Sequence, residues 1–328
     1  MRLILNSITV LALTLNIACL NATVGHGHAA TPVNPAAYPS RPIRLLTTEP
    51  GSGTNVVARL LAQELSLKLG QPVIVDNRGI AAVEIVAHAQ ADGHTLLVYT
   101  SPMWLLSFMR GKVAWDVTRD FAPISLTSRQ PSVLAVHPQL AVNSVLELIA
   151  LTRAKPGALN YGSGTAGAPS HLSAELFNSL AGTRITRIPF KGGGPALTAL
   201  MAREVQLGFG VPAAVLPLAR SGRLKALAVT SAEQSPLAPG LATIADSGLP
   251  QYEATAIAGF FVPAGTREPI IRILNTEAVR ILSAHDTQER LLNAGVEGVS
   301  SSPQQLAAAV QHDRVKWGKV IREAAISD

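Results

Sequence analysis

The chain has 328 residues, of which 48% are hydrophobic and 15% are charged. This length suits about two domains and the apolar fraction can fill a sizeable core, so a disordered chain and a coiled coil are both excluded. The formal net charge is +6, but the basic residues are scattered and aromatic residues make up only 4%, which excludes a nucleic-acid-binding surface of the usual kind.

The first 30 residues have the features of a secretory signal peptide. Arg2 precedes a mostly apolar stretch at 3–20, and small residues end the segment at Ala30. Polar residues such as Asn16 interrupt the stretch, which argues against a transmembrane anchor. We therefore expect export and cleavage near Ala30, with lipid attachment at Cys19 as the alternative. Cys19 is the only cysteine, so the mature chain is expected to have neither disulfides nor thiolate metal sites.

Strands and helices alternate through the first part of the mature chain. Helical spacing is clearest where apolar residues recur at 57–69 and Gly70 ends the pattern. A Gly-rich turn at 51–54 separates this helix from the strand before it. The predicted elements are a strand at 43–48, a helix at 57–69, a strand at 72–76, a helix at 82–91 and a strand at 95–99. Units of this kind predict a parallel sheet with crossover helices.

The same alternation returns after Pro131 and ends in a helical tail. A second Gly-rich turn at 162–167 again separates a strand from a helix, and Pro169 suits the first position of that helix. The stretch at 302–305 has the form of a capping box for the last helix. The predicted elements are strands at 133–137, 158–161, 185–189, 205–209, 224–229 and 256–262, with helices at 144–153 and 169–180.

Together these elements predict an α/β fold of two lobes, each a sheet flanked by helices, joined by two crossing strands. We expect the first lobe to take residues 39–135 and 256–328, and the second to take residues 136–255. Ligands of such folds bind between the lobes, outside the carboxyl ends of the strands. The site is therefore expected where the two Gly-rich turns face each other.

Each Gly-rich turn combines glycines with hydroxyl side chains directly before a helix. Glycines let the backbone approach a ligand closely, and the exposed N–H groups of a helix start attract anions. The first turn offers Ser52 and Thr54, and the second offers Ser163 and Thr165. The two turns could hold the two ends of a small dianion; the alternative is that each is only a tight turn with a helix cap. A third Gly-rich turn places Lys191 either towards the cleft or as an ordinary exposed lysine.

No cofactor or metal site is expected. Gly162, Gly164 and Gly167 spell G-x-G-x-x-G, but the acidic residue that a dinucleotide site needs about 20 positions later is missing from 184–191. No phosphate-binding Gly-Lys-Ser/Thr motif occurs, and the histidines after residue 30 have no metal-ligand spacing.

An exported serine hydrolase is the main alternative function. Ser163 could pair with His171, and Glu175 lies one helical turn further on. However, Tyr161 stands where the nucleophile-elbow pattern needs glycine. We therefore expect His171 to be a hydrogen-bonding residue at a helix start, and we expect the protein not to be an enzyme.

Short motifs follow one another in a set order from residue 38 to the final helix. They are YPSRPI at 38–43, GTNVVAR at 53–59, VDNR at 75–78, ADGHTLL at 91–97, KPGALNY at 155–161, SHL at 170–172, FKG at 190–192, PALT at 195–198, LAVTS at 227–231, GLP at 248–250 and VPAGT at 262–266. In this order they resemble the periplasmic solute-binding proteins of tripartite tricarboxylate transporters, also called the Bug family.

The resemblance implies a two-lobe Venus flytrap of the periplasmic-binding type. Such a protein captures a carboxylate or a related small molecule in its cleft and delivers it to integral-membrane transporter subunits; we expect it to act as a monomer. A ligand sensor that docks on a membrane receptor is an alternative with the same sequence. The expected ligand-binding residues are Glu49, Gly51, Ser52, Gly53, Thr54, Asn55, Ser101, Ser163, Gly164, Thr165, Gly167, Ser170, His171, Lys191 and Gly210.

Three of these positions depart from the family pattern. Glu49 stands about where the first loop usually carries an aromatic residue, Asn55 replaces the usual Asp, and Gly210 stands where an Asp often pairs with a ligand amine. An amino acid held through that Asp is therefore not expected. Glu49 directly follows the first strand, so its carboxylate is expected near the ligand, where it accepts a hydrogen bond from a ligand amide or amine. The alternative is that Glu49 points into solvent.

Overall fold

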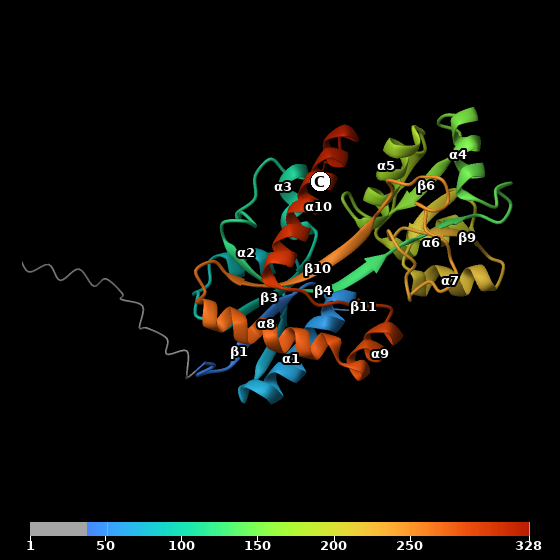
Figure 1. Cartoon of the computed structure of the whole chain (residues 1–328). Helices are drawn as coiled ribbons and strands as arrows, with labels where there is room; N and C mark the ends of the chain where they lie inside the picture. The colour runs from blue at the N-terminus through green and yellow to red at the C-terminus, as the bar shows by residue number, and fades with distance from the viewer. Residues whose placement is uncertain (1–37, 51, 328) are drawn as a thin grey trace, which may run out of the picture. The chain divides into compact units, whose positions relative to one another are not determined.

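The structure, a computed structural model, describes residues 38–50 and 52–327. The expected signal peptide with Cys19, and Gly51 of the first turn, lie outside these residues. All described residues belong to one contact unit, which begins at Pro35. Two sheets organise this unit (Figure 1).

The first sheet has six strands in the order β11-β4-β10-β3-β1-β2. Its strands are β1 (Ile43–Thr47), β2 (Val73–Asn77), β3 (Thr95–Thr100), β4 (Phe121–Pro131), β10 (Thr255–Pro263) and β11 (Glu297–Gly298). β1 pairs in parallel with β2 and β3, while β10 runs antiparallel to β3 and β4. The carboxyl ends of β1, β2 and β3 therefore share one edge.

The second sheet has five strands in the order β7-β6-β8-β5-β9. Its strands are β5 (Val133–Val136), β6 (Asn160–Ser163), β7 (Thr186–Pro189), β8 (Leu207–Gly210) and β9 (Lys225–Val229). β6 pairs in parallel with β7 and β8, and β5 runs antiparallel to β8 and β9. Because β5 pairs in this sheet from Val133 onward, the chain leaves the first sheet at Ser132, and the expected boundary at residue 135 falls inside β5.

Helices cover both sheets. In Figure 1, α1 and α8 lie on one face of the six-stranded sheet, and α2, α3 and α10 lie on the other. The helices are α1 (Gly53–Leu69), α2 (Ala81–Ala87), α3 (Pro102–Met109), α4 (Val145–Ala154), α5 (Pro169–Ala181), α6 (Gly193–Met201), α7 (Pro212–Arg220), α8 (Glu268–Ser283), α9 (His285–Asn293) and α10 (Pro303–Glu323). α1 ends at Gly70, whose φ of 68° suits the left-handed cap. α10 begins with the predicted capping box of Ser302 and Gln305.

Three elements of the first sheet region, α3, β4 and β11, were not predicted. β4 is buried on both faces yet contains Ser125, Thr127 and Ser128, so it lacks the apolar signature of a central strand. Ser301 compensates part of this polarity: its N–H donates to Ser125 Oγ at 2.9 Å, and its Oγ accepts from the Leu126 N–H at 2.9 Å. A hydrogen-bond partner 175 residues away cannot be seen in a local sequence pattern.

The chain passes between the sheets at two places, and Thr230 joins them. The Thr230 hydroxyl accepts from the Ser132 N–H at 2.7 Å and donates to the Ala254 carbonyl at 2.7 Å. The Thr230 backbone also donates to the Ser132 carbonyl and accepts from the Ala254 N–H, each at 2.8 Å. Thr230 is fully buried, so these four bonds have no competition from water.

Replacing Thr230 by Val tests this junction. The substitution keeps the shape but leaves the Ser132 N–H and the Ala254 carbonyl without their side-chain partner, so we expect a loss of about 2–4 kcal/mol in the free energy of unfolding. Urea denaturation measures this loss. Thr230→Ser keeps the hydroxyl and is the control, expected to lose about 1 kcal/mol for the missing methyl group. Equal losses in the two variants would show that the hydroxyl contributes nothing.

Candidate functional site

The predicted turns both lie at the carboxyl ends of parallel strands. The first turn follows β1, beside the loops after β2 and β3. The second turn follows β6, beside the loop after β7 that carries Lys191. Each sheet thus presents loops and helix starts at one edge, which is where parallel α/β sheets bind ligands.

Arg187 organises the second turn, although no sequence motif pointed to it. Its Nε donates to Ser163 Oγ at 2.8 Å and its Nη2 donates to the Gly164 carbonyl at 2.8 Å. Ser163 Oγ donates in turn to the Gly164 carbonyl at 3.1 Å, and the Ser163 side chain is fully buried. Ser163 is therefore a partner of Arg187 inside the turn. The groups that the Arg187 guanidinium contacts can be identified only when β6 and β7 are known to be neighbours in the sheet.

His171 and Ser170 hold the rest of this turn. The Gly164 N–H donates to Ser170 Oγ at 3.1 Å, and the Gly167 N–H donates to His171 Nδ1 at 3.2 Å. Burial and the neighbouring Arg187 guanidinium lower the pKa of His171 to about 4. The ring is therefore neutral at pH 7, with its proton on Nε2 because Nδ1 accepts a bond. Gly167 has a φ of 71°, and Met109 Sδ of α3 lies 2.4 Å from where its Cβ would stand, so only glycine fits here.

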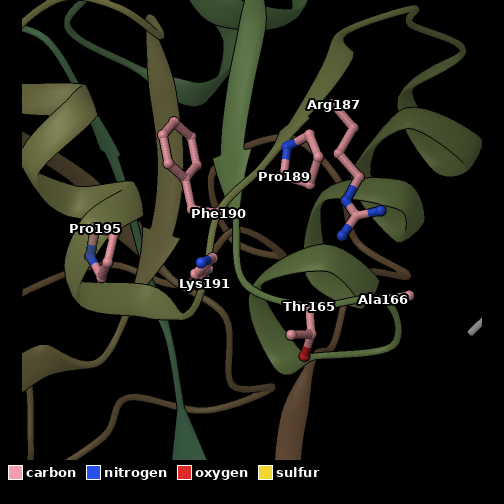
Figure 2. Close-up of a pocket in the computed structure, with 7 residues that line it drawn as sticks. All are labelled: Thr165, Ala166, Arg187, Pro189, Phe190, Lys191 and Pro195. Carbon is pink, nitrogen blue, oxygen red and sulfur yellow. The ribbon is translucent and has the colours of Figure 1, made fainter.

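An open groove of about 710 Å³ lies over this turn and is basic. Figure 2 shows the Arg187 side chain running from β7 towards the loop that carries Thr165 and Ala166, while Lys191 lies beside the start of α6. Arg187 and Lys191 are the two charged residues of its lining, and no carboxylate lines it. Its lining residues are Thr165, Ala166, Arg187, Pro189, Phe190, Lys191 and Pro195. This groove attracts anions by charge.

The first turn is braced by its own side chains. Ser52 caps α1 by accepting from the Asn55 N–H at 3.1 Å, and its hydroxyl also lies 2.6 Å from Thr48 Oγ1. Asn77 Nδ2 donates to the Thr48 carbonyl at 2.6 Å. Arg59 donates to both Asn55 Oδ1 and Asn77 Oδ1, each at 3.2 Å. The motif residues around this turn therefore bond mostly its backbone and one another, while the buried Asn55 Nδ2 has no hydrogen-bond partner among the described residues.

Glu49 lies over the loop that follows β2. A Cβ on Gly79 would stand 2.0 Å from Glu49 Oε1, so the carboxylate rests against the Gly79 backbone, and Gly79 has a φ of 54°. The Glu49 side chain is exposed, and its charge helps burial to raise the pKa of Tyr99 in β3. Glu49 thus stands just after the carboxyl end of β1 in the six-stranded sheet, with its negative charge open to water.

The remaining predicted residues divide between two small cavities beside β10. Gly53 and Thr54 line a cavity of about 10 Å³ together with Ser128 and Gln130, two polar residues that the sequence did not single out. Ser101 lines a second cavity of about 10 Å³ with Pro169, Leu172 and Ser173 at the start of α5. Each has room for about one water molecule.

Gly210 ends β8 and does not belong to these cavities. A Cβ there would stand 2.6 Å from Val215 Cγ2, which explains a glycine on packing grounds. Lys191 and Thr165 line one groove, and Ser163, Gly164, Gly167, Ser170 and His171 share one hydrogen-bonded turn. Across the described chain, no hydrogen bond joins the first turn to the second.

The described residues do not assemble a hydrolase triad. Ser163 Oγ bonds Arg187 and Gly164, His171 Nδ1 bonds the Gly167 N–H, and Glu175 accepts from the Tyr161 hydroxyl. Serine, histidine and carboxylate are therefore each committed to other partners. Within residues 38–50 and 52–327, no group of three or more His, Cys, Asp or Glu side chains is arranged to hold a metal ion. The same residues contain no helix with the length and apolarity of a membrane span.

Comparison with known proteins identifies the family. Residues 57–326 match the model of the tripartite tricarboxylate transporter family receptor. Protein BugT of Bordetella pertussis is 33% identical over 314 residues, which cover 94% of this chain and 96% of BugT. Two solved structures are also similar. Rpa4515 of R. palustris, solved with adipate, has a TM-score of 0.74 and 34% identity, covering 88% of this chain and 99% of that one.

The second solved structure is MatC (Rpa3494) from Rhodopseudomonas palustris with bound malate. It has a TM-score of 0.70 and 31% identity, covering 87% of this chain and 100% of that one. These similarities extend over both sheets and confirm the predicted two-lobe α/β fold. The chain therefore belongs to the tripartite tricarboxylate transporter receptor family, the Bug-type solute-binding proteins that its sequence motifs predicted.

Proposed function

We propose that this protein captures a small organic carboxylate in the cleft between its two sheets. The observation that carries the proposal is the basic groove over the second turn, where Arg187 and Lys191 stand without a lining carboxylate. Membership of a receptor family and the bound adipate and malate of the related Rpa4515 and MatC support it.

Arg187 is the principal anchor for the ligand carboxylate in this proposal. Its Nε and Nη2 are held by Ser163 and Gly164, so the guanidinium plane is fixed before the ligand arrives. Lys191 and the N-terminus of α6, which begins at Gly193, add charge and N–H donors on the same side. Charge-assisted bonds contribute about 1.5–3 kcal/mol each. Three or four of them, less the cost of lobe closure, give a Kd of about 1 μM, or about −8.2 kcal/mol.

The ligand is delivered rather than converted. The protein performs no chemistry in this proposal, because Ser163, His171 and Glu175 are each bonded elsewhere. We assign the mature chain to the periplasm after removal of the first 30 residues, and its partner is an integral-membrane transporter of the tripartite tricarboxylate type. It acts as a monomer of two lobes. The first lobe takes residues 39–132 and 255–327, and the second takes the residues between.

Replacing Arg187 by Gln tests the anchor. We expect the Kd for malate, adipate or succinate to rise between 10-fold and 150-fold, which corresponds to about 1.5–3 kcal/mol for one charge-assisted contact. Isothermal titration calorimetry measures the change. Arg184→Gln is the matched control, because it removes the same charge from an exposed position next to the amino end of β7. Equal affinity in the wild type and in Arg187→Gln would remove Arg187 from the site.

Ser163→Ala separates positioning from contact. Because the Ser163 hydroxyl holds Arg187 Nε and is buried, its loss is expected to weaken carboxylate binding through Arg187. The double variant with Arg187→Gln should then bind no more weakly than Arg187→Gln alone. Additive losses in this cycle would mean that Ser163 contacts the ligand itself, as the sequence predicted.

Glu49→Gln tests the negative charge opposite the groove. Two unit charges about 4 Å apart interact by about 4 kcal/mol at an effective dielectric of about 20, and exposure reduces this. We therefore expect Glu49→Gln to bind succinate several-fold more tightly, and to bind a carboxylate with an amide or amine at its far end more weakly. Calorimetry with both ligands measures this. Glu84→Gln removes an exposed carboxylate of α2 as the control. Changes within about 0.5 kcal/mol for both ligands would place Glu49 outside the site.

Turnover assays distinguish the binding protein from the hydrolase. Activated esters and amides are incubated with the wild type, with Ser163→Ala and with His171→Ala, and product is followed by absorbance. We expect no turnover above the uncatalysed rate in any of them. Steady turnover by the wild type that both substitutions abolish would establish the hydrolase instead.

A further inference from the structure

A second polar cavity, of about 360 Å³, lies beside the crossing strands and has no part in the proposed carboxylate site. Arg129 of β4 and Thr255 of β10 line it, whereas their chain neighbours Ser128, Gln130 and Ala256 line the small cavity beside Gly53, and Ile257 lines both. Because successive side chains of a strand point to opposite faces, the two cavities lie mainly on opposite faces of β4 and β10 and meet at Ile257.

Segments from both sheet regions build its walls. The loop that follows β9, from Ser231 to Ser235, lines it together with α10 and β11, and Ser235 Oγ donates to Glu297 Oε2 of β11 at 3.3 Å. A volume of this size lies within the range of small-molecule sites.

The cavity already accommodates one ammonium group. Lys316 Nζ of α10 donates to the Glu253 carbonyl at 3.3 Å and lies 3.7 Å from Glu253 Oε2. The same ammonium lies 4.9 Å from the centre of the Trp317 ring, which lines the small cavity beside Ser101 instead of this one. Within this cavity the ammonium therefore contacts a carboxylate and a carbonyl, two groups that bind an organic cation.

The other charges of the cavity leave an excess of acid. Glu233, Glu297 and Asp313 have no ion pair within the described chain. Arg129 is the one fixed cation of the lining besides Lys316, and His312 adds charge only when protonated. Because Glu253 is paired to Lys316, the lining has three acids and one base without an ion pair, so its net charge is −2. An occupant that balances this lining is cationic.

Asp313 is the buried member of this group. Its side chain belongs to a residue only 4% exposed, and Oδ2 accepts from the Trp104 indole N–H at 3.2 Å. Burial raises the pKa of Asp313 to about 6, against the lowering effects of Lys316, Trp104 and Trp317. The Lys316 charge and the two neutral indole donors thus offset only part of the desolvation of this carboxylate.

We propose that this cavity binds a small organic amine, whose positive charge balances the acids of the lining that have no ion pair, Asp313 among them. The lining explains the class of ligand: acids to pair with the cation, and Leu126, Ile257 and Ala309 to contact an alkyl chain. Because the walls come from both sheet regions, binding of the amine also favours the arrangement in which those walls are together.

Calorimetry with putrescine, at pH 8 where Asp313 is ionised, tests the proposal. We expect saturable binding to the wild-type protein and at least tenfold weaker binding to Asp313→Asn, which keeps the shape and an acceptor for Trp104. Glu289→Gln removes an exposed carboxylate of α9 and is the matched control, expected to bind as the wild type does. The neutral analogue 1,4-butanediol should not bind. Absence of putrescine binding by the wild type, or equal affinity in Asp313→Asn, would overturn the proposal.

Two further measurements keep the test independent of folding defects in Asp313→Asn. Ala309→Leu fills the cavity without changing its charge, so we expect it to weaken putrescine binding at least tenfold while circular dichroism and thermal unfolding show a folded protein. Lowering the pH from 8 to 5 protonates Asp313, so binding to the wild type should weaken. That pH dependence should be smaller in Asp313→Asn. Unchanged binding in Ala309→Leu would place the amine elsewhere.

Discussion

The junction at Thr230 is the constraint on which the two-lobe arrangement depends. A single buried hydroxyl and its own peptide unit join the outgoing chain at Ser132 to the returning chain at Ala254 through four hydrogen bonds. Any relative movement of the two sheets has to bend the chain around these bonds or break them. If these bonds break, the freed N–H, carbonyl and hydroxyl groups have no water to bond instead, because the three residues are buried. The junction thus defines where a hinge can lie, and both cavities beside β10 are close to it in sequence.

Rigidity on either side of that hinge comes from residues that resemble binding residues in the sequence. Arg59 donates to Asn55 and to Asn77 beside the first turn, and Arg187 donates to Ser163 in the second. These groups hold backbone loops and one guanidinium in place before any ligand arrives. Preorganisation of this kind lowers the conformational cost of binding, so it contributes to affinity without direct contact. A motif that is specific for a family can therefore mark the support of a site.

The alternation of strands and helices was sufficient to predict the α/β fold, the family and the two Gly-rich turns. β4 was not predicted because the polar residues Ser125, Thr127 and Ser128 are buried in it, and Ser125 has its partner at the far end of the chain. Arg187 was not predicted for a related reason: only the pairing of β6 with β7 brings it to Ser163. Asp313 lies in a helix with ordinary spacing, and its burial depends on Trp104 of an unpredicted helix. Local pattern predicts elements, whereas these residues acquire their roles from long-range packing.

β10 separates two environments of opposite charge preference. On one side, Ala256 lines both small cavities, which contain Gly53, Thr54 and Ser101 of the proposed carboxylate cleft. On the other side, Thr255 and Ile257 face a cavity in which unpaired carboxylates outnumber the unpaired guanidinium. In the proposed function the carboxylate lies between the two sheets, and the lining of the acidic cavity comes from both sheet regions, so ligands on the two sides would share the same hinge. Thermodynamic linkage then requires the coupling to be reciprocal: if the amine changes the affinity for the carboxylate by some factor, the carboxylate changes the affinity for the amine by the same factor. The sign of this coupling depends on whether the walls of both sites come together in the same closed arrangement. If they do, each ligand strengthens the binding of the other.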